Sequence, residues 1–198
     1  KNHELNRERV EEGLKPANGI LLRGAGIFRK VEPFHERNGV SAGGVATEAL
    51  YLGSARYVGM EKVIKVEDDS EKIFQALKLL KKYEFVFVHF KKTDNAGHDG
   101  DALRKVKEIE KIDSYLWPLL ELSDVTVAIT GDHATPCELR NHSGDLVPIL
   151  LWGRHVEPDN VPFFGESTAT SGGIGIIRAR DIVPMLSNLA GRMKELGK

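Results

Sequence analysis

Residues 85–100 read FVFVHFKKTDNAGHDG, a short apolar run that passes directly into a polar cluster. The run from Phe85 to Phe90 has the length and the β-branched and aromatic content of a buried strand. Asp94 and His98 lie just beyond the carboxyl end of this run. In an open α/β sheet, functional sites gather at the carboxyl ends of the strands. This stretch therefore predicts both a buried strand and the beginning of a functional site.

The same pattern recurs later in the chain. Val125 to Thr130 is a second apolar run, and the pair Asp132-His133 follows it directly. His142 lies a few residues further on. Each cluster alone has an ordinary explanation, such as a surface ion pair or a structural histidine. Carboxylate and imidazole ligands suit zinc or manganese, and several of them can hold two ions. Together the clusters predict a metal site that consists of Asp94, His98, Asp132, His133 and His142.

Strands and helices alternate along most of the sequence. Strands are expected at residues 42–45, 62–66, 85–90, 125–130 and 147–151, and helices at residues 3–12, 47–52, 70–82, 101–120 and 181–196. Residues 17–26 read as a short apolar strand that runs into a glycine turn carrying Arg23, and residues 30–39 read as a linker. Alternating strands and helices are typical of an α/β fold with a mostly parallel sheet.

Composition excludes several classes of protein. The chain has 198 residues, enough for one ordinary domain with a fragment of a second, and 41% of them are hydrophobic. A net charge of -1 argues against binding to nucleic acid, and no apolar run is long enough to span a membrane. The single cysteine, Cys137, fits a reducing cytoplasm. A first residue other than methionine leaves open a processed, truncated or partial polypeptide.

Three segments carry a resemblance to the alkaline phosphatase superfamily, and within it to the archaeal type of cofactor-independent phosphoglycerate mutase. They are residues 87–100, 130–139 and 141–148, which contain all five candidate metal ligands. Residues 16–18 and 21–26, which read PAN and LLRGAG, are also similar to that family. The resemblance covers essentially the whole chain.

The resemblance implies a three-layer α/β/α sandwich and a site for two divalent ions, with Mn, Zn, Co and Mg left open and no organic cofactor. Asp94, His98 and His142 would hold one ion, and Asp132 with His133 the other. The implied activity is the conversion of 3-phosphoglycerate to 2-phosphoglycerate in glycolysis or gluconeogenesis, through a phosphoserine intermediate. Residues 1–38 would be the tail of an inserted cap domain, in which Arg23 binds substrate, and residues 39–198 would belong to the metal-binding domain.

Two parts of the family pattern have no counterpart in this sequence. One is the first strand, whose aspartate helps to hold the second ion, and the other is the nucleophilic serine. Ser143, beside His142, matches a hydroxyl of the family that is not the nucleophile, so no catalytic nucleophile is assigned in this chain. The chain therefore resembles the carboxyl-terminal half of the enzyme. We expect it to be inactive alone, to need an amino-terminal segment on the same or a separate chain, and to expose a free sheet edge.

Other functions remain open from the sequence. A metal-dependent phosphatase or another phosphomutase of the same superfamily would use the same ligands. A subunit that binds metal without catalysing a reaction would also fit. The sequence predicts a cytoplasmic protein with phosphoglycerate as its small-molecule partner, and it leaves a homo-oligomer open. Lys91 and Lys92, which precede the first cluster, are either solvated or hold substrate charge.

Overall fold

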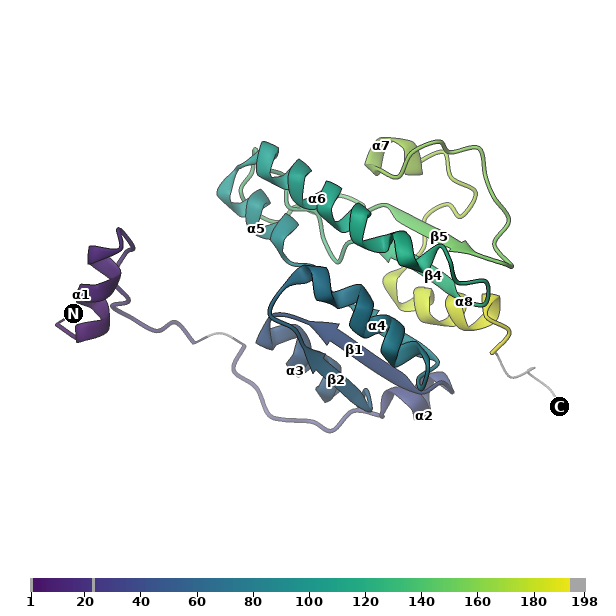
Figure 1. The fold of residues 1–198 in the computed structure, drawn as a ribbon, viewed down its shortest axis with the longest axis horizontal. Helices are drawn as coiled ribbons and strands as arrows, with labels where there is room; N and C mark the ends of the chain where they lie inside the picture. The colour runs from purple at the N-terminus through teal and green to yellow at the C-terminus, as the bar shows by residue number, and fades with distance from the viewer. Residues whose placement is uncertain (1, 23, 193–198) are drawn as a thin grey trace. The chain divides into compact units, whose positions relative to one another are not determined.

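The structure, a computed structural model, describes residues 2–22 and 24–192. It consists of two compact units, Lys1–Lys30 and Val31–Lys198 (Figure 1). Phe34 stacks on Phe85 of the second unit, with ring centroids 4.9 Å apart. The assignment of residues 1–38 to a cap domain stays a prediction.

The first unit contains one helix, α1 (Glu4–Glu11), within its described residues. The side chain of Asn6 joins this helix to the segment that follows, because its amide donates to the Ala17 carbonyl and its Oδ1 accepts from the Ala17 amide. The strand predicted over residues 17–26 was wrong, since the described part of this segment forms no strand. Ile20, Leu21 and Leu22 are exposed, and no neighbouring strand offers hydrogen bonds to them in the described unit.

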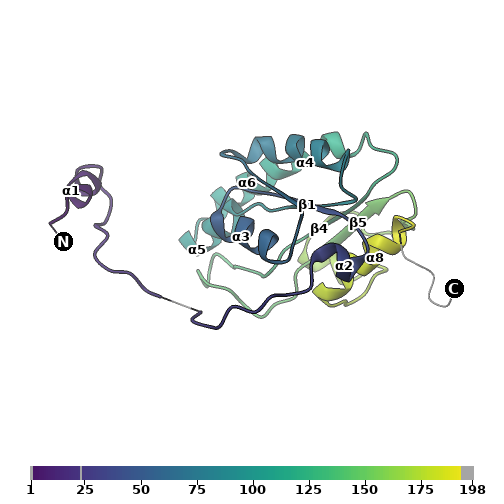
Figure 2. The same cartoon turned by 90° about the horizontal axis from the view of Figure 1, so that it is seen from below.

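The second unit is built on a parallel sheet with the strand order β2-β1-β3. Its strands are β1 (Ala42–Ala46), β2 (Lys62–Lys65) and β3 (Phe85–Val88), joined by α3 (Ala49–Tyr57), η1 (Asp69–Glu71) and α4 (Lys72–Leu80). A Cβ on Gly43 would contact Leu79 of α4, whereas one on Gly44 would contact Ala55 of α3. Because successive residues of a strand face opposite sides, α3 and α4 cover opposite faces of the sheet (Figure 2).

A second, antiparallel sheet pairs β4 (Thr126–Thr130) with β5 (Ile149–Gly153). It is reached from β3 through α5 (Lys92–Asp99), α6 (Ala102–Leu116) and η2 (Trp117–Leu119), and α8 (Ile182–Leu189) packs against β4. The remaining elements are α2 (Phe34–Asn38), α7 (Glu166–Ala169) and η3 (Ala179–Asp181). Within the described residues, the two sheets share no strand.

The α/β architecture and the order of its main elements confirm the sequence prediction. The linker predicted at residues 30–39 instead contains α2, because Phe34 is buried in a cluster with Val40 and Ala42. The closing helix predicted over residues 181–196 ends at Leu189, and residues 193–196 lie outside the described part. Among the helices that the structure describes, none has both the length and the apolar character required to cross a membrane.

Candidate metal centre

The first two candidate ligands lie on α5, the short helix that begins four residues after β3 ends. Asp94 is in its first turn and His98 follows one turn later, so that both side chains lie on the same face of the helix. The Asp94 Oδ1 to His98 Nε2 distance is 3.6 Å. Gly100 ends the helix with a φ of 72°, a left-handed conformation that glycine adopts without strain.

The other three candidates come from the segment between β4 and β5. Asp132 and His133 follow the end of β4, and His142 lies in the same connection. Nε2 of His142 is 3.5 Å from Asp94 Oδ1 and 3.1 Å from Nε2 of His98. The imidazole of His133 stacks on that of His142 at 3.7 Å between ring centroids. The structure therefore brings the two ligand clusters together at the carboxyl ends of β3 and β4.

A hydrogen bond determines which nitrogen of His98 faces the centre. Nδ1–H of His98 donates to the backbone carbonyl of Arg140 at 3.1 Å, which leaves the Nε2 lone pair facing Asp94 and His142. Arg140 has a φ of 51°, a left-handed conformation that is uncommon for residues other than glycine. Its backbone is held in a strained conformation at the position where its carbonyl orients a candidate ligand.

Thr135 connects the two clusters. Its hydroxyl donates to Asp94 Oδ1 at 2.6 Å, so it has no proton left and accepts from Nδ1–H of His133 at 3.1 Å. This bond leaves Nε2 of His133 free, 3.4 Å from Oδ2 of Asp132. The Thr135 carbonyl accepts from the ammonium group of Lys105 at 2.8 Å. Thr135 therefore orients one ligand from each side of the centre.

Gly97 allows α5 to approach this loop closely. A Cβ at this position would lie 2.9 Å from Cγ2 of Thr135, and even nearer to the Thr135 carbonyl oxygen. Only glycine avoids this overlap without a backbone shift. The glycine in the sequence between Asp94 and His98 is therefore explained by packing of the helix against the second ligand segment.

The carboxyl group of Asp94 is held in its charged form. Partial burial alone would raise its pKa, but hydrogen bonds from Lys91 and Thr135 and the positive charge of Lys91 outweigh this effect. The pKa of Asp94 is lowered to about 2. An ionised carboxylate among imidazole lone pairs is a suitable environment for a divalent cation.

Three residues of the centre were not assigned to it from the sequence. Thr135 lies inside the segment 130–139 and Arg140 directly after it, but nothing in their type predicts a role in orienting a histidine. Lys91 was left as a solvated or substrate-binding lysine, whereas the structure pairs it with Asp94. The spacing of three residues between Lys91 and Asp94 is the signal that could have predicted this pair. Arg23, the predicted substrate-binding residue, lies outside the described residues.

His89 is a further polar residue at the carboxyl end of β3. In the described part of the chain its Nδ1 and the nearby Glu48 Oε2 are buried without a hydrogen-bond partner. These two atoms are 3.9 Å apart. Burial lowers the pKa of His89 to about 4, so its imidazole is neutral near pH 7.

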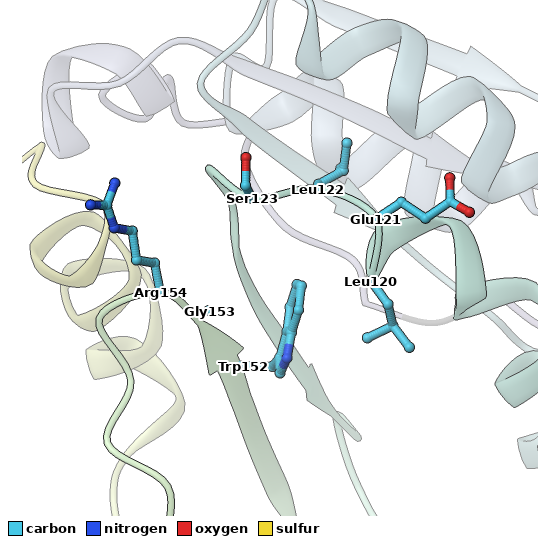
Figure 3. A pocket seen from close by; sticks show the side chains of 7 residues that line it. All are labelled: Leu120, Glu121, Leu122, Ser123, Trp152, Gly153 and Arg154. Atoms are coloured by element: carbon cyan, nitrogen blue, oxygen red, sulfur yellow. The ribbon is translucent and has the colours of Figure 1, made fainter.

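A separate hollow lies at the opposite end of β4 from Asp132. It is lined by residues 120–123 and by Trp152, Gly153 and Arg154. Figure 3 shows Trp152 of β5 facing Leu120, which follows η2. The hollow contains no member of the metal centre and therefore offers no part of its chemistry.

Comparisons with known proteins identify a matching family and several similar proteins. The sequence profile of the metalloenzyme superfamily matches residues 8–189. The 2,3-bisphosphoglycerate-independent phosphoglycerate mutase of Thermococcus kodakarensis is 43% identical over 206 residues, covering 98% of this chain and 50% of that protein. The protein of the same name from Ignicoccus hospitalis is 44% identical over 207 residues, covering 100% of this chain and 50% of that protein. The chain therefore spans about half the length of these relatives.

Two solved structures share the fold. The PH0037 protein from Pyrococcus horikoshii superposes with a TM-score of 0.80 at 43% identity, over 84% of this chain and 54% of that one. The cofactor-independent phosphoglycerate mutase from Thermoplasma acidophilum gives a TM-score of 0.67 at 28% identity, over 96% of this chain and 48% of that one. The predicted α/β fold is confirmed, and the chain forms part of a larger domain.

Proposed function

Because the chain belongs to the metalloenzyme superfamily, we propose that it is the metal-binding half of a cofactor-independent phosphoglycerate mutase. The proposed reaction interconverts 3-phosphoglycerate and 2-phosphoglycerate. The names and the identities of the archaeal relatives support this choice of substrate. Since the chain spans about half of each relative, the proposed enzyme is active only when the remaining half is present.

The geometry of three ligand atoms carries the proposal. Oδ1 of Asp94 and the two Nε2 atoms of His98 and His142 are separated by 3.6, 3.5 and 3.1 Å. Ligands about 2.0–2.1 Å from a tetrahedral zinc ion are about 3.3 Å from one another. The three distances are near this value, so the residues fit one divalent ion. Asp132 and His133, with 3.4 Å between Oδ2 and Nε2, are proposed to hold a second ion.

Two divalent ions at this centre would stabilise the negative charge of a phosphoryl group during transfer. The residues of this chain would bind the ions and hold the ligand side chains in position. Asp94 stays ionised, Arg140 and Thr135 fix the histidine tautomers, and Lys91 adds a positive charge at the edge of the centre. The serine that accepts the phosphoryl group is proposed to lie in the other half, together with a further carboxylate ligand.

The exposure of the ligands agrees with the proposal that the other half supplies the remaining residues of the site. The side chain of Asp132 is 58% exposed and that of His142 is 49% exposed, so the outer side of the centre is open. Residues 1–38 are proposed to be the tail of an inserted cap domain that binds substrate, with Arg23 as a ligand of the phosphate or carboxylate. An Arg23→Ala variant should then raise KM while leaving metal binding unchanged.

The decisive experiment joins this chain to an amino-terminal half. The unmatched half of the Thermococcus kodakarensis relative is fused in front of Lys1, and the conversion of 3-phosphoglycerate is assayed with p-nitrophenyl phosphate as a control substrate. Isomerisation is expected, whereas hydrolysis without isomerisation would indicate a phosphatase. Metal uptake without either reaction would indicate a non-catalytic subunit.

A matched pair of variants tests the ligand assignment in the same fusion. His142→Ala should reduce Mn²⁺ or Zn²⁺ affinity at least about tenfold, because it removes one of three convergent donors. His155→Ala, an exposed histidine outside the centre, is the control and should bind metal as the parent does. Equal affinities in both variants would remove His142 from the ligand set.

A further inference from the structure

The helix α5 carries two of the candidate ligands, yet its start is held by few contacts of its own. Within the described residues, the side chain of Lys91, its N-cap residue, makes no capping hydrogen bond. The helix has 8 residues, and helices of this length are marginal without tertiary contacts. Asp94 lies in the first turn, so its position depends on what holds this end of α5 to the rest of the unit.

Asp69 of η1 is a buried carboxylate whose two oxygens contact two different parts of the fold. Its side chain is 6% exposed. Oδ1 lies 2.6 Å from the ammonium group of Lys72, the first residue of α4. The same oxygen accepts from the hydroxyl of Thr47, directly after β1, at 3.5 Å. Oδ2 lies 3.3 Å from the ammonium group of Lys92, the first residue of α5. Asp69 therefore joins the core of the unit to the start of α5.

The linker between β3 and α5 contacts the same group of residues. Nζ of Lys72 lies 4.9 Å from the centroid of the Phe90 ring, in this linker. Asp68, the N-cap residue of η1, caps η1 with Oδ1, and its Oδ2 lies 3.7 Å from Nζ of Lys92. The linker and the first residue of α5 are thus both held by residues near the start of α4.

The position of Lys92 also sets which way Asp94 faces. The two residues are two positions apart, so their side chains point about 200° apart around a helix with 3.6 residues per turn. Lys92 contacts η1 on one side of α5. Asp94 therefore faces the other side, where its carboxylate meets His98 and His142. A rotation of α5 that broke the contact of Lys92 would turn Asp94 away from these histidines.

The energetics of these contacts favour a role in position over a role in stability. The desolvation cost of a buried ion pair can exceed its Coulombic gain, so the pair of Lys72 and Asp69 is weak evidence of added stability. The side chain of Lys92 is 43% exposed, and solvent screens an ion pair at such a site. Loss of the Lys92 ammonium group should therefore change the free energy of unfolding little while it frees the start of α5.

We propose that Lys92 is a positioning residue of the metal centre, because its ion pair with the buried Asp69 fixes the rotation of α5 and thereby the place of Asp94. This inference rests on the proposed function, in which Asp94 is a metal ligand. It also answers the question that the sequence left open for Lys92. Its ammonium group binds a carboxylate of the chain itself instead of substrate charge.

Binding of Co²⁺ to the chain tests the effect on the centre, with the visible absorption of the bound ion as the signal. Lys92→Met keeps a long side chain and a good helix former but removes the charge. It should weaken Co²⁺ binding about tenfold, the low end of the range for residues that orient metal ligands. Lys92→Arg keeps the positive charge and should recover most of the affinity.

Lys65→Met is the matched control, because Lys65 forms an exposed pair with Glu67 at 2.7 Å on β2. It should bind Co²⁺ as the parent does. The midpoint of urea unfolding of the metal-free protein should be the same in Lys92→Met and Lys65→Met, which separates positioning from stability. Equal Co²⁺ affinity in these two variants overturns the proposal, and so does an equal loss in Lys92→Met and Lys92→Arg.

Amide hydrogen exchange of the metal-free protein tests the anchor itself. The amides of Ala96 and Gly97, in the interior of α5, should exchange about tenfold faster in Lys92→Met, because local opening of the helix becomes easier. Exchange in β1 (Ala42–Ala46) should not change. Unchanged exchange in α5, or equally faster exchange in β1, overturns the proposal.

A further variant identifies the partner of Lys92. Asp68→Asn keeps a side chain that can cap η1 but removes the charge 3.7 Å from Lys92. Its Co²⁺ affinity and its exchange in α5 should equal those of the parent, because Asp69 remains. If Asp68→Asn has the same effects as Lys92→Met, then Asp68 is the anchor and the role of Asp69 is rejected.

The two readouts separate this inference from the proposed function. Faster exchange in α5 of Lys92→Met, in a chain whose parent binds no Co²⁺, supports the anchor and rejects the metal centre. Equal Co²⁺ binding by the parent and Lys92→Met, with isomerisation in the fused enzyme, supports the mutase assignment and rejects the positioning role of Lys92.

Discussion

Gly97 provides a sensitive test of how α5 and the second ligand segment are held together. In Gly97→Ala the new Cβ would lie 2.9 Å from Cγ2 of Thr135 and 3.1 Å from its Cβ, with the Thr135 carbonyl oxygen nearer still. Part of the overlap is with backbone, which cannot rotate away. We expect α5 to shift away from the loop, which moves Asp94 and His98 away from His142.

The expected change in the free energy of unfolding follows from two opposing effects. Alanine is favoured over glycine in a helix interior by about 1 kcal/mol, and this gain applies to any unobstructed helical site. Overpacking of a tight contact costs about 1–3 kcal/mol. Gly53 of α3 is the matched control, because nothing lies within 4 Å of a Cβ placed there. Gly97→Ala should therefore be about 1–3 kcal/mol less stable than Gly53→Ala.

Urea unfolding of the two metal-free variants measures this difference, and titration with Zn²⁺ measures its effect on the centre. Gly53→Ala should be at least as stable as the parent and should bind Zn²⁺ equally well. Gly97→Ala should be less stable and should bind Zn²⁺ more weakly. If Gly97→Ala is as stable as Gly53→Ala and keeps its Zn²⁺ affinity, then the close approach of α5 to Thr135 is not what positions the ligands.

Three further predictions concern polar residues of the second unit. The pKa of His89 is lowered from 6.5 to about 4 by burial, so protonation favours the unfolded chain. The free energy of unfolding should therefore fall by about 3 kcal/mol as the pH is lowered from 6.5 to about 4. Urea unfolding of His89→Gln should lack this dependence on pH. Lys72→Ala removes the 2.6 Å partner of the buried Asp69, which keeps Lys92 at 3.3 Å, and should cost about 2 kcal/mol in the same assay. Lys65→Ala, at an exposed pair, should cost less than about 1 kcal/mol. Thr135→Val should weaken Zn²⁺ binding about tenfold or more in a chelator competition, because it removes the bonds to Asp94 and His133, and an unchanged affinity would exclude this orienting role.

The sequence predicted the parts of the structure that depend on local pattern. The strands near residues 42–46, 62–65, 85–88 and 126–130 were found because apolar runs end at turn or polar residues. The five candidate ligands were found because carboxylates and imidazoles follow two strand ends. Their convergence was expected because the carboxyl ends of parallel strands share one edge of a sheet. In the described residues β3 and β4 lie in separate sheets, and it is the contact between α5 and the loop of Thr135 that joins the two clusters.

The features that the sequence did not predict depend on contacts between distant segments. Thr135 became part of the centre because α5 packs against its loop, and the left-handed conformation of Arg140 has no local signal such as a glycine. Phe34 lies in a polar segment, and its contacts with distant residues such as Phe85 make α2 part of the core. The separation of the described strands into two sheets is also non-local, because strand pairing joins segments that are distant in the sequence.

Within the described residues β3 and β4 each have a free edge, and these edges bear on the order in which such a protein folds. Strand pairs between distant parts of a sequence form late, because long-range contacts must first overcome the entropy of closing a large loop. Until then, two uncharged strands remain available to any other extended chain. Folding therefore competes with aggregation at these two edges, and the time that passes before long-range pairing sets the interval during which the chain is vulnerable.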